Sequence, residues 1–199
     1  MHKTIFTIAL LLTAATTAAA QSPATGQILG HDYVDLGLSV MWATCNIGAS
    51  SPSDYGDYFA WGEAETKSIY TQDNSATYNK SSYTFLDAAS AQWGSAWRMP
   101  TMAECQELID NCIWRWTTVG GHKGYKVTSK KNGNSIFVPA AGLRNDTQLN
   151  YADEWGYYWS SSPYESDSYY AYYLSISSGY YSVYWDLRYL GLSIRPVSE

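Results

Sequence analysis

The sequence predicts an α+β protein of one domain, with small twisted antiparallel sheets, one clear amphipathic helix and long ordered loops. Residues 101–112 carry apolar side chains at helical spacing behind a helix-start signal. Several other segments alternate with the period of two that is typical of half-buried strands. Removal of a predicted leader of 20 residues from the chain of 199 leaves enough sequence for one hydrophobic core.

Residues 1–20 are predicted to be a signal peptide. A weakly positive start is followed by the apolar run "TIFTIALLLTAATT" and by the small residues "AAA" at the expected cleavage site. The run is too short to span a bilayer core of about 30 Å, so we expect export without membrane insertion, to the periplasm, the cell surface or the medium. Residues 21–32 are predicted to be a mobile lead-in to a domain at 33–197.

The net charge and the positions of the cysteines argue against several classes of partner and cofactor. The net charge is −6 and no lysine or arginine cluster occurs, which argues against nucleic acid and anionic membranes. Of three cysteines, Cys105 and Cys112 lie about 10 Å apart along the predicted helix, beyond disulfide reach. Any disulfide therefore includes Cys45, and the alternative is three buried thiols. His31 and His122 stand apart from these cysteines, so we expect no zinc and no other cofactor.

The region before the helix is predicted to contain two short strands and a long loop. Apolar side chains alternate from Val34 to Leu38 and from Val40 to Thr44. Residues 49–68 combine turn formers with aromatic rings, which predicts an ordered loop with anchored rings. Residues 69–82 have no clear period and are expected to be irregular. Four acidic residues in the loop could gather around a hard cation or serve ordinary turns, and we predict no metal: Asp54, Asp57, Glu63 and Glu65.

The helix is predicted from Thr101 to Cys112. Thr101 and Glu104 have the spacing of a capping box, and Pro100 marks the entry. The apolar stripe consists of Met102, Cys105, Leu108, Ile109 and Cys112.

The chain after the predicted helix is predicted to form β-strands. "GYKVTSKKNGNSIFVPAAG" reads as a hairpin that turns at residues 131–133 and whose second strand ends at Pro139. "YYWSSS", "YYAYYLSIS" and "LSIRPV" predict three further strands. In the middle one, Leu174 and Ile176 are expected to point inward, which sends Ser175 and Ser177 outward.

Tyrosine is concentrated near the end of the chain. Twelve of the 19 tyrosines lie between Tyr151 and Tyr189, interleaved with serine. Tyrosine gives a rigid amphipathic contact area and serine gives adaptable hydrogen bonds, the combination used by antibody paratopes. The alternative is an outer sheet face without a ligand, because tyrosine also has a high β-propensity.

Several motifs in order resemble the FISUMP (major paralogous) domain of exported bacterial proteins. They are "YVDLGLSVMWATCNIGASSPSDYGDYFAWGE", "WGSAWRMPTMAECQELIDNCIWRW", "GYKV", "NGNSIFVPAAGLR", "GYYWSSS" and "SIRPV", which together span about 33–197. Cys105 departs from the family, which has a bulky aromatic there. This family is similar to the C-type-lectin-like fold of formylglycine-generating enzymes and of the variable proteins of diversity-generating retroelements. The resemblance implies framework roles for Trp42, Trp61, Trp97, Arg98, Pro100 and Trp159.

The same resemblance implies a binding site at the C-terminal sheet and loop. The positions that match the variable ones are Ser175, Ser177, Tyr180, Ser182, Tyr184, Asp186, Leu187, Tyr189, Leu190 and Leu192. The EPN, QPD and WND tripeptides of calcium-dependent lectins do not occur, and no cysteine follows Cys112, so neither calcium-mediated sugar binding nor formylglycine chemistry is implied.

The function expected from these observations is an exported, metal-independent module that binds a protein or a glycan through this Tyr/Ser-rich face. The sequence has no phosphate loop, nucleophile elbow or paired-histidine helix motif, and we expect no catalytic residues. A structural surface or pilus-associated subunit is the alternative. An enzyme related to the formylglycine-generating group is a more distant one.

Overall fold

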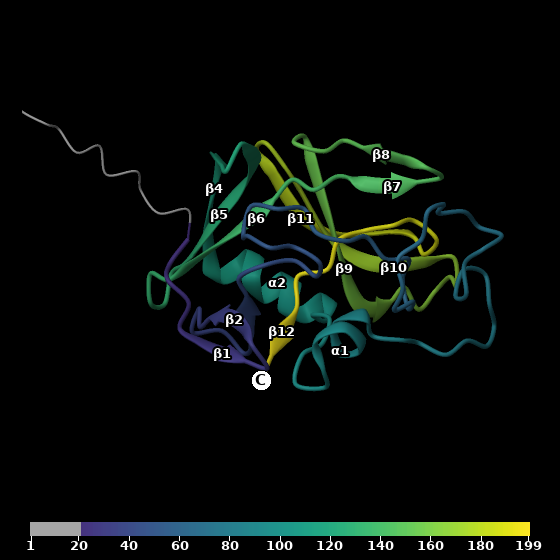
Figure 1. The fold of residues 1–199 in the computed structure, drawn as a ribbon, viewed down its shortest axis with the longest axis horizontal. Helices are drawn as coiled ribbons and strands as arrows, with labels where there is room; N and C mark the ends of the chain where they lie inside the picture. Colours follow the sequence, from purple (N-terminus) through teal and green to yellow (C-terminus); the bar gives the residue numbers. More distant parts are fainter. Residues whose placement is uncertain (1–20) are drawn as a thin grey trace, which may run out of the picture.

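The computed structural model describes residues 21–199, and the predicted signal peptide lies outside this range. Small antiparallel sheets and two short helices make up this part of the chain, in agreement with the predicted α+β class (Figure 1). One sheet has the order β1 (Gly26–Ile28), β2 (His31–Val34), β3 (Met41–Ala43) and β12 (Val197–Ser198). A second contains β4 (Cys112–Val119), β5 (His122–Ser129) and β6 (Ser135–Pro139). A third has the order β11 (Tyr180–Leu187), β10 (Tyr170–Ser177) and β9 (Trp155–Pro163). The fourth pairs β7 (Leu143–Asn145) with β8 (Gln148–Asn150).

The segment 21–32 is part of the fold, where a mobile lead-in was expected. Strand β1 pairs with β2, and the Ser22 amide donates to the Ser135 carbonyl at 2.9 Å. The β1–β2 turn has positive φ at both central residues, Leu29 (50°) and Gly30 (84°), as a two-residue hairpin requires. Leucine is an unusual residue for such a turn, so the sequence carried no Asn-Gly signal for it. The last strand, β12, joins the same sheet beside β3 (Figure 1).

The predicted helix is confirmed as α2 (Met102–Asn111), with Thr101 as its N-cap. The Glu104 amide donates to Thr101 Oγ1 at 3.2 Å, and Glu104 Oε2 accepts from the Thr101 amide at 2.7 Å. Arg98 donates two hydrogen bonds to the Glu104 carboxylate, at 2.7 and 2.9 Å. Cys105 and Leu108 are buried against the sheet of β9, β10 and β11. The helix ends one residue before the predicted limit, because Cys112 begins β4.

Several predicted strands are present and others were missed. The β5–β6 hairpin and its end at Pro139 are confirmed, and Gly133 turns it with φ of 76°. The first predicted strand, at 34–38, is wrong beyond Val34, because β2 lies ahead of it at His31–Val34; β3 lies within the second predicted strand at 40–44. "LSIRPV" forms isolated bridges, and only its last residue enters a strand. Helix α1 (Ala88–Trp93) and strands β4 and β11 were not predicted.

The long loop between β3 and α1 is ordered by buried aromatic side chains, as predicted. The Trp61 indole donates to the Ser160 carbonyl at 2.9 Å, and the Trp159 indole donates to the Phe59 carbonyl at the same distance. The Tyr70 hydroxyl donates to the Tyr58 carbonyl. The two indole hydrogen bonds fix the loop to β9, and the tyrosine hydrogen bond holds the loop together.

Candidate binding face

Strand β11 and its neighbour β10 bring six of the ten predicted site residues to one face of their sheet. Ser175 pairs with Ser182, and Ser177 pairs with Tyr180, so these side chains share a face. Tyr184 and Asp186 follow at alternate positions on β11. The opposite face carries Leu174 and Ile176, which pack in the core around α2. We call the first face the tyrosine face; it consists of Trp155, Tyr157, Trp159, Ala171, Tyr173, Ser175, Ser177, Tyr180, Ser182, Tyr184 and Asp186.

Ser175 and Ser177 are buried, contrary to the prediction that they face solvent. They are 3% and 8% exposed, respectively. The direction of their side chains was predicted correctly, but aromatic residues surround them: Ser175 pairs with Tyr157 on β9 and lies two residues from Tyr173 on its own strand. The solvent-exposed part of the face therefore lies on β11, where Tyr180 is 43% and Tyr184 is 48% exposed.

The last four predicted site residues lie beyond or at the end of β11. Leu190 and Leu192 are buried in the core cluster that contains Trp159, so their assignment to a binding surface is wrong. The Phe59–Leu192 bridge explains this burial, because it pairs the segment with the long loop. Leu187 and Tyr189 are half-buried against the same cluster. The Tyr189 ring packs edge-on against Tyr78, with 5.2 Å between ring centroids.

A row of aromatic rings crosses the tyrosine face from β11 to β9. Tyr180 lies against Trp155 with 5.9 Å between centroids, and Trp155 stacks on Tyr157 at 6.2 Å. Tyr157 then contacts Tyr173 at 5.6 Å. Burial raises the pKa of Tyr157 to about 12 and also raises that of Tyr173. These two hydroxyls stay protonated at neutral pH and can both donate and accept hydrogen bonds.

A second group of rings surrounds Trp185 of β11. The Tyr184 and Trp185 rings stack at 4.4 Å, and Trp185 stacks on Tyr164 at 5.1 Å. Trp185 is 37% exposed. Sequence reasoning did not assign Trp185, Tyr164 or Trp155 to the site, because the match to variable positions skipped them. The high density of aromatic residues in the sequence around these three positions was the signal that could have identified them.

Asp186 is a carboxylate in a largely aromatic setting. Burial raises its pKa, and a hydrogen bond from the Leu187 amide at 2.8 Å partly offsets this effect. No ion pair within residues 21–199 includes Asp186. Its cross-strand partner is Ala171, whose small side chain leaves the carboxylate beside Tyr173 and Tyr157.

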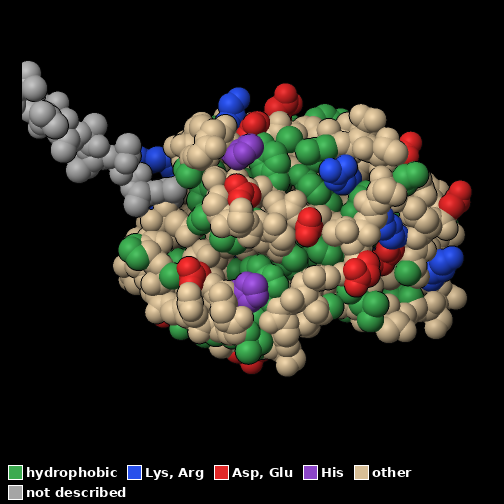
Figure 2. All heavy atoms as spheres, viewed as in Figure 1, with side chains coloured by type: hydrophobic (Ala, Val, Ile, Leu, Met, Phe, Trp, Pro, Cys, Tyr) green, Lys and Arg blue, Asp and Glu red, His purple; other side chains and the backbone are tan. Residues whose placement is uncertain are grey.

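The wider surface is mixed in charge. Figure 2 shows acidic and basic side chains scattered over the visible side of the molecule, with hydrophobic side chains, among which tyrosine is counted, between them. Within residues 21–199, no group of three or more His, Cys, Asp or Glu side chains is placed to hold a metal ion. In the long loop, Asp54 accepts hydrogen bonds from Ser50 and Ser51, and Glu63 pairs with Lys67 at 2.5 Å. No helix in this range is long and apolar enough to cross a membrane.

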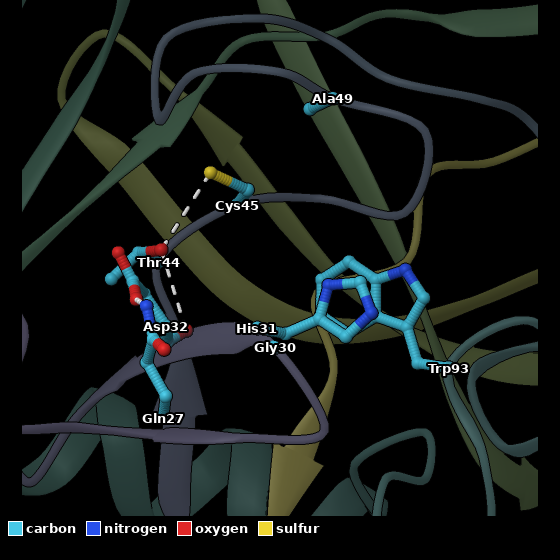
Figure 3. A pocket seen from close by; sticks show the side chains of 8 residues that line it. All are labelled: Gln27, Gly30, His31, Asp32, Thr44, Cys45, Ala49 and Trp93. Carbon is cyan, nitrogen blue, oxygen red and sulfur yellow. Dashed lines mark hydrogen bonds between the residues drawn. The ribbon is translucent and has the colours of Figure 1, made fainter.

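A small pocket of about 200 Å³ lies away from the tyrosine face, between the first sheet and α1 (Figure 3). It contains a thiol, Cys45, and an imidazole, His31, but no hydrogen bond joins them. The His31 ring stacks on Trp93 at 3.8 Å, and burial lowers its pKa. The Thr44 hydroxyl lies 3.6 Å from the Cys45 sulfur. All three cysteines are free thiols.

Comparison with known proteins gives one partial match. Residues 122–197 match the family model described as "Domain of unknown function (DUF8237)", which covers less than half of the chain. The matched segment runs from the start of β5 to β12 and includes the whole tyrosine face. No curated protein and no solved structure matches.

Proposed function

We propose that this protein is an exported binding module with a C-type-lectin-like fold, and that it recognises a protein or a glycan through the tyrosine face without a metal ion. The FISUMP-like motifs and the signal-peptide pattern of the sequence support the fold and the export. One observation carries the binding role: Tyr180 and Tyr184 are 43% and 48% exposed on the same face of β11, and the Trp185 ring, 37% exposed, stacks on that of Tyr184. Large aromatic side chains of this kind dominate the energetics of interfaces.

The structure of the sheet supports recognition by a preorganised surface. The opposite face of β10 and β11 packs on α2, and the row of rings from Trp155 to Tyr173 lies beside the exposed rings on the same face. Rigid aromatic side chains lose little conformational entropy when they bind. Tyrosine hydroxyls and the Asp186 carboxylate add hydrogen-bonding groups among the rings. This combination suits a ligand with both polar and apolar surface.

A screen of the mature chain, residues 21–199, on a glycan array and in a pull-down of surface proteins tests this function. The captured ligand should bind equally well with EDTA present. Tyr184→Ala should weaken capture by about 2 kcal/mol or more, with an unchanged melting temperature. Ile113→Ala, which truncates a side chain 57% exposed on β4, is the control and should bind as the wild type. Wild-type capture by Tyr184→Ala and Tyr180→Ala would remove the tyrosine face from consideration.

A structural subunit is the second candidate, and the position of β11 favours it. This eight-residue strand lies at the edge of its sheet and pairs with β10 alone. An exposed edge of this length can accept a strand from another subunit. A partner that binds in this way would protect the β11 backbone amides and would tolerate Tyr184→Ala.

A further inference from the structure

The strongest unassigned site is a pocket at one end of the tyrosine face. It has a volume of about 400 Å³, within the range of roughly 300–1,000 Å³ usual for small-molecule sites. Two indole rings line it, Trp116 from β4 and Trp155 from β9. Ser177 and Ser178, where β10 turns into β11, complete that side. We call it the indole pocket.

The two indoles are held in place by neighbouring rings. Trp116 packs edge-on against the buried Tyr125, with 4.9 Å between centroids. The Tyr125 hydroxyl donates to the Ser177 carbonyl at 2.9 Å and accepts from the Gly179 amide at 3.0 Å, which ties this wall to the β10–β11 turn. Trp155 stacks on Tyr157. Both tryptophans are half-buried.

Charged groups of both signs also line the indole pocket. Asp153 is fixed by the Lys123 amide, which donates to Oδ1 at 2.8 Å. Burial raises the pKa of Asp153, but this hydrogen bond and one from the Tyr55 hydroxyl outweigh it and lower the pKa, so the carboxylate stays ionised. The side chains of Glu154 and Lys123 are exposed, and neither forms an ion pair within residues 21–199. Two carboxylates against one ammonium disfavour an anionic ligand.

From this arrangement we infer that the indole pocket binds a neutral pyranose ring, with its C–H face on an indole and its hydroxyls on the polar groups. A pyranose has apolar faces and a rim of hydroxyls that both donate and accept hydrogen bonds. The indoles match the faces, and the carboxylates, the ammonium and the serine hydroxyls match the rim. This inference rests on the proposed function and names its ligand class: the pocket shares Ser177 and Trp155 with the tyrosine face, so a glycan chain continues from one to the other.

The experiment titrates the mature chain with methyl pyranosides of neutral hexoses and N-acetylhexosamines and follows ¹H–¹⁵N amide shifts. A methyl hexuronide serves as the anionic comparison. At least one neutral pyranoside should shift the amides of residues 153–155 and 177–179. Trp116→Ala should weaken this binding about tenfold or more, and Trp116→Phe should retain most of it. Trp93→Ala is the matched control, because Trp93 is also half-buried but lines the other pocket, and it should bind as the wild type.

Three results would overturn the inference: no neutral pyranoside binds, the hexuronide binds better, or a folded Trp116→Ala chain binds as the wild type. Melting temperatures establish that each variant is folded, and Trp116→Phe serves if Trp116→Ala is not. The proposed function is tested separately by Tyr184→Ala, which lies outside the pocket. If Tyr184→Ala abolishes capture of a protein ligand and no pyranoside binds, the proposed binding function is supported and the pyranose site is rejected.

Discussion

At the scale of single residues, Arg195 shows how a charged side chain can organise the interior. Its guanidinium is 2% exposed and donates to Asn46 Oδ1 at 2.8 Å and to the Phe137 carbonyl at 3.0 Å. It also donates to the carbonyls of Ala43 and Thr44, at 3.2 and 2.9 Å. One side chain thus joins β3, the following loop and β6.

We predict that Arg195→Met lowers the free energy of unfolding by about 3–5 kcal/mol, because it leaves four buried acceptors without their donor. Urea unfolding measures this value. The control is Arg115→Met, an exposed position on β4 where we expect almost no change. A loss below about 1 kcal/mol in Arg195→Met would mean that water replaces the guanidinium.

The three thiols should differ in reactivity. Cys105 and Cys112 are 1% and 3% exposed; burial raises the pKa of Cys105 and raises that of Cys112 to about 11. Cys45 is half-buried and lines the pocket in Figure 3. Because the thiolate is the reactive form, native labelling should be slow and confined to Cys45, and Cys45→Ser should abolish it. Rapid labelling of Cys105 or Cys112 before unfolding would contradict this.

The direction of a side chain proved easier to predict than its burial. Strand alternation placed Ser175 and Ser177 on the face opposite Leu174, which the structure has. It could not reveal that Tyr157, from a different strand, flanks Ser175, because that contact depends on strand pairing. Leu190 and Leu192 were misassigned for a similar reason, since the long loop that buries them comes from residues far away in the sequence.

At the scale of elements, α2 begins where its capping box predicts, because both partners of the box lie within four residues. Thr101→Ala removes the acceptor for the Glu104 amide. We predict a loss of about 1 kcal/mol in the free energy of unfolding and no change in ligand affinity. A loss of affinity at unchanged stability would assign this segment to the binding site instead of the framework.

The same cap gives the stability a defined pH dependence. Burial raises the pKa of Glu104, but hydrogen bonds from Arg98 and Thr101 outweigh it and hold the pKa below its usual value. A lowered folded-state pKa stabilises the protein above the unfolded-state pKa of about 4.3, and this contribution is lost as the pH falls through the folded-state value. The difference in unfolding free energy between wild type and Glu104→Gln should therefore shrink between about pH 6 and pH 3. A constant difference would contradict the assignment.

Elements without a local signal were missed. Helix α1 has six residues, too few for an apolar period, and its Asp87 cap also accepts from the Met99 amide, a contact outside the helix. Strand β11 reads "YYSVYWDL", where tyrosine occurs on both faces and hides the alternation. The β10–β11 turn at Ser178 and Gly179 lacks the Asn-Gly pair that identified the β5–β6 hairpin.

At the scale of the whole molecule, the two ends of the described chain meet in one sheet. The first and last described strands share a sheet, and the long loop is fixed to β9 by the Trp61 and Trp159 indoles. Strand β11 is left at an edge with exposed rings. The tyrosine-rich end of the sequence indicated where these rings lie, but which of them are exposed depends on the pairing of β9, β10 and β11 and on the long loop packed against that sheet.

The central claim is that ligands bind on β11 and the rings around it. Hydrogen–deuterium exchange of the mature chain, with and without the captured ligand and with EDTA present, tests this most directly. We expect slower exchange on ligand binding in residues 177–187 and 153–157, and unchanged exchange in the long loop at 49–68. Protection confined to the long loop or to the first sheet, or protection that EDTA abolishes, would contradict it.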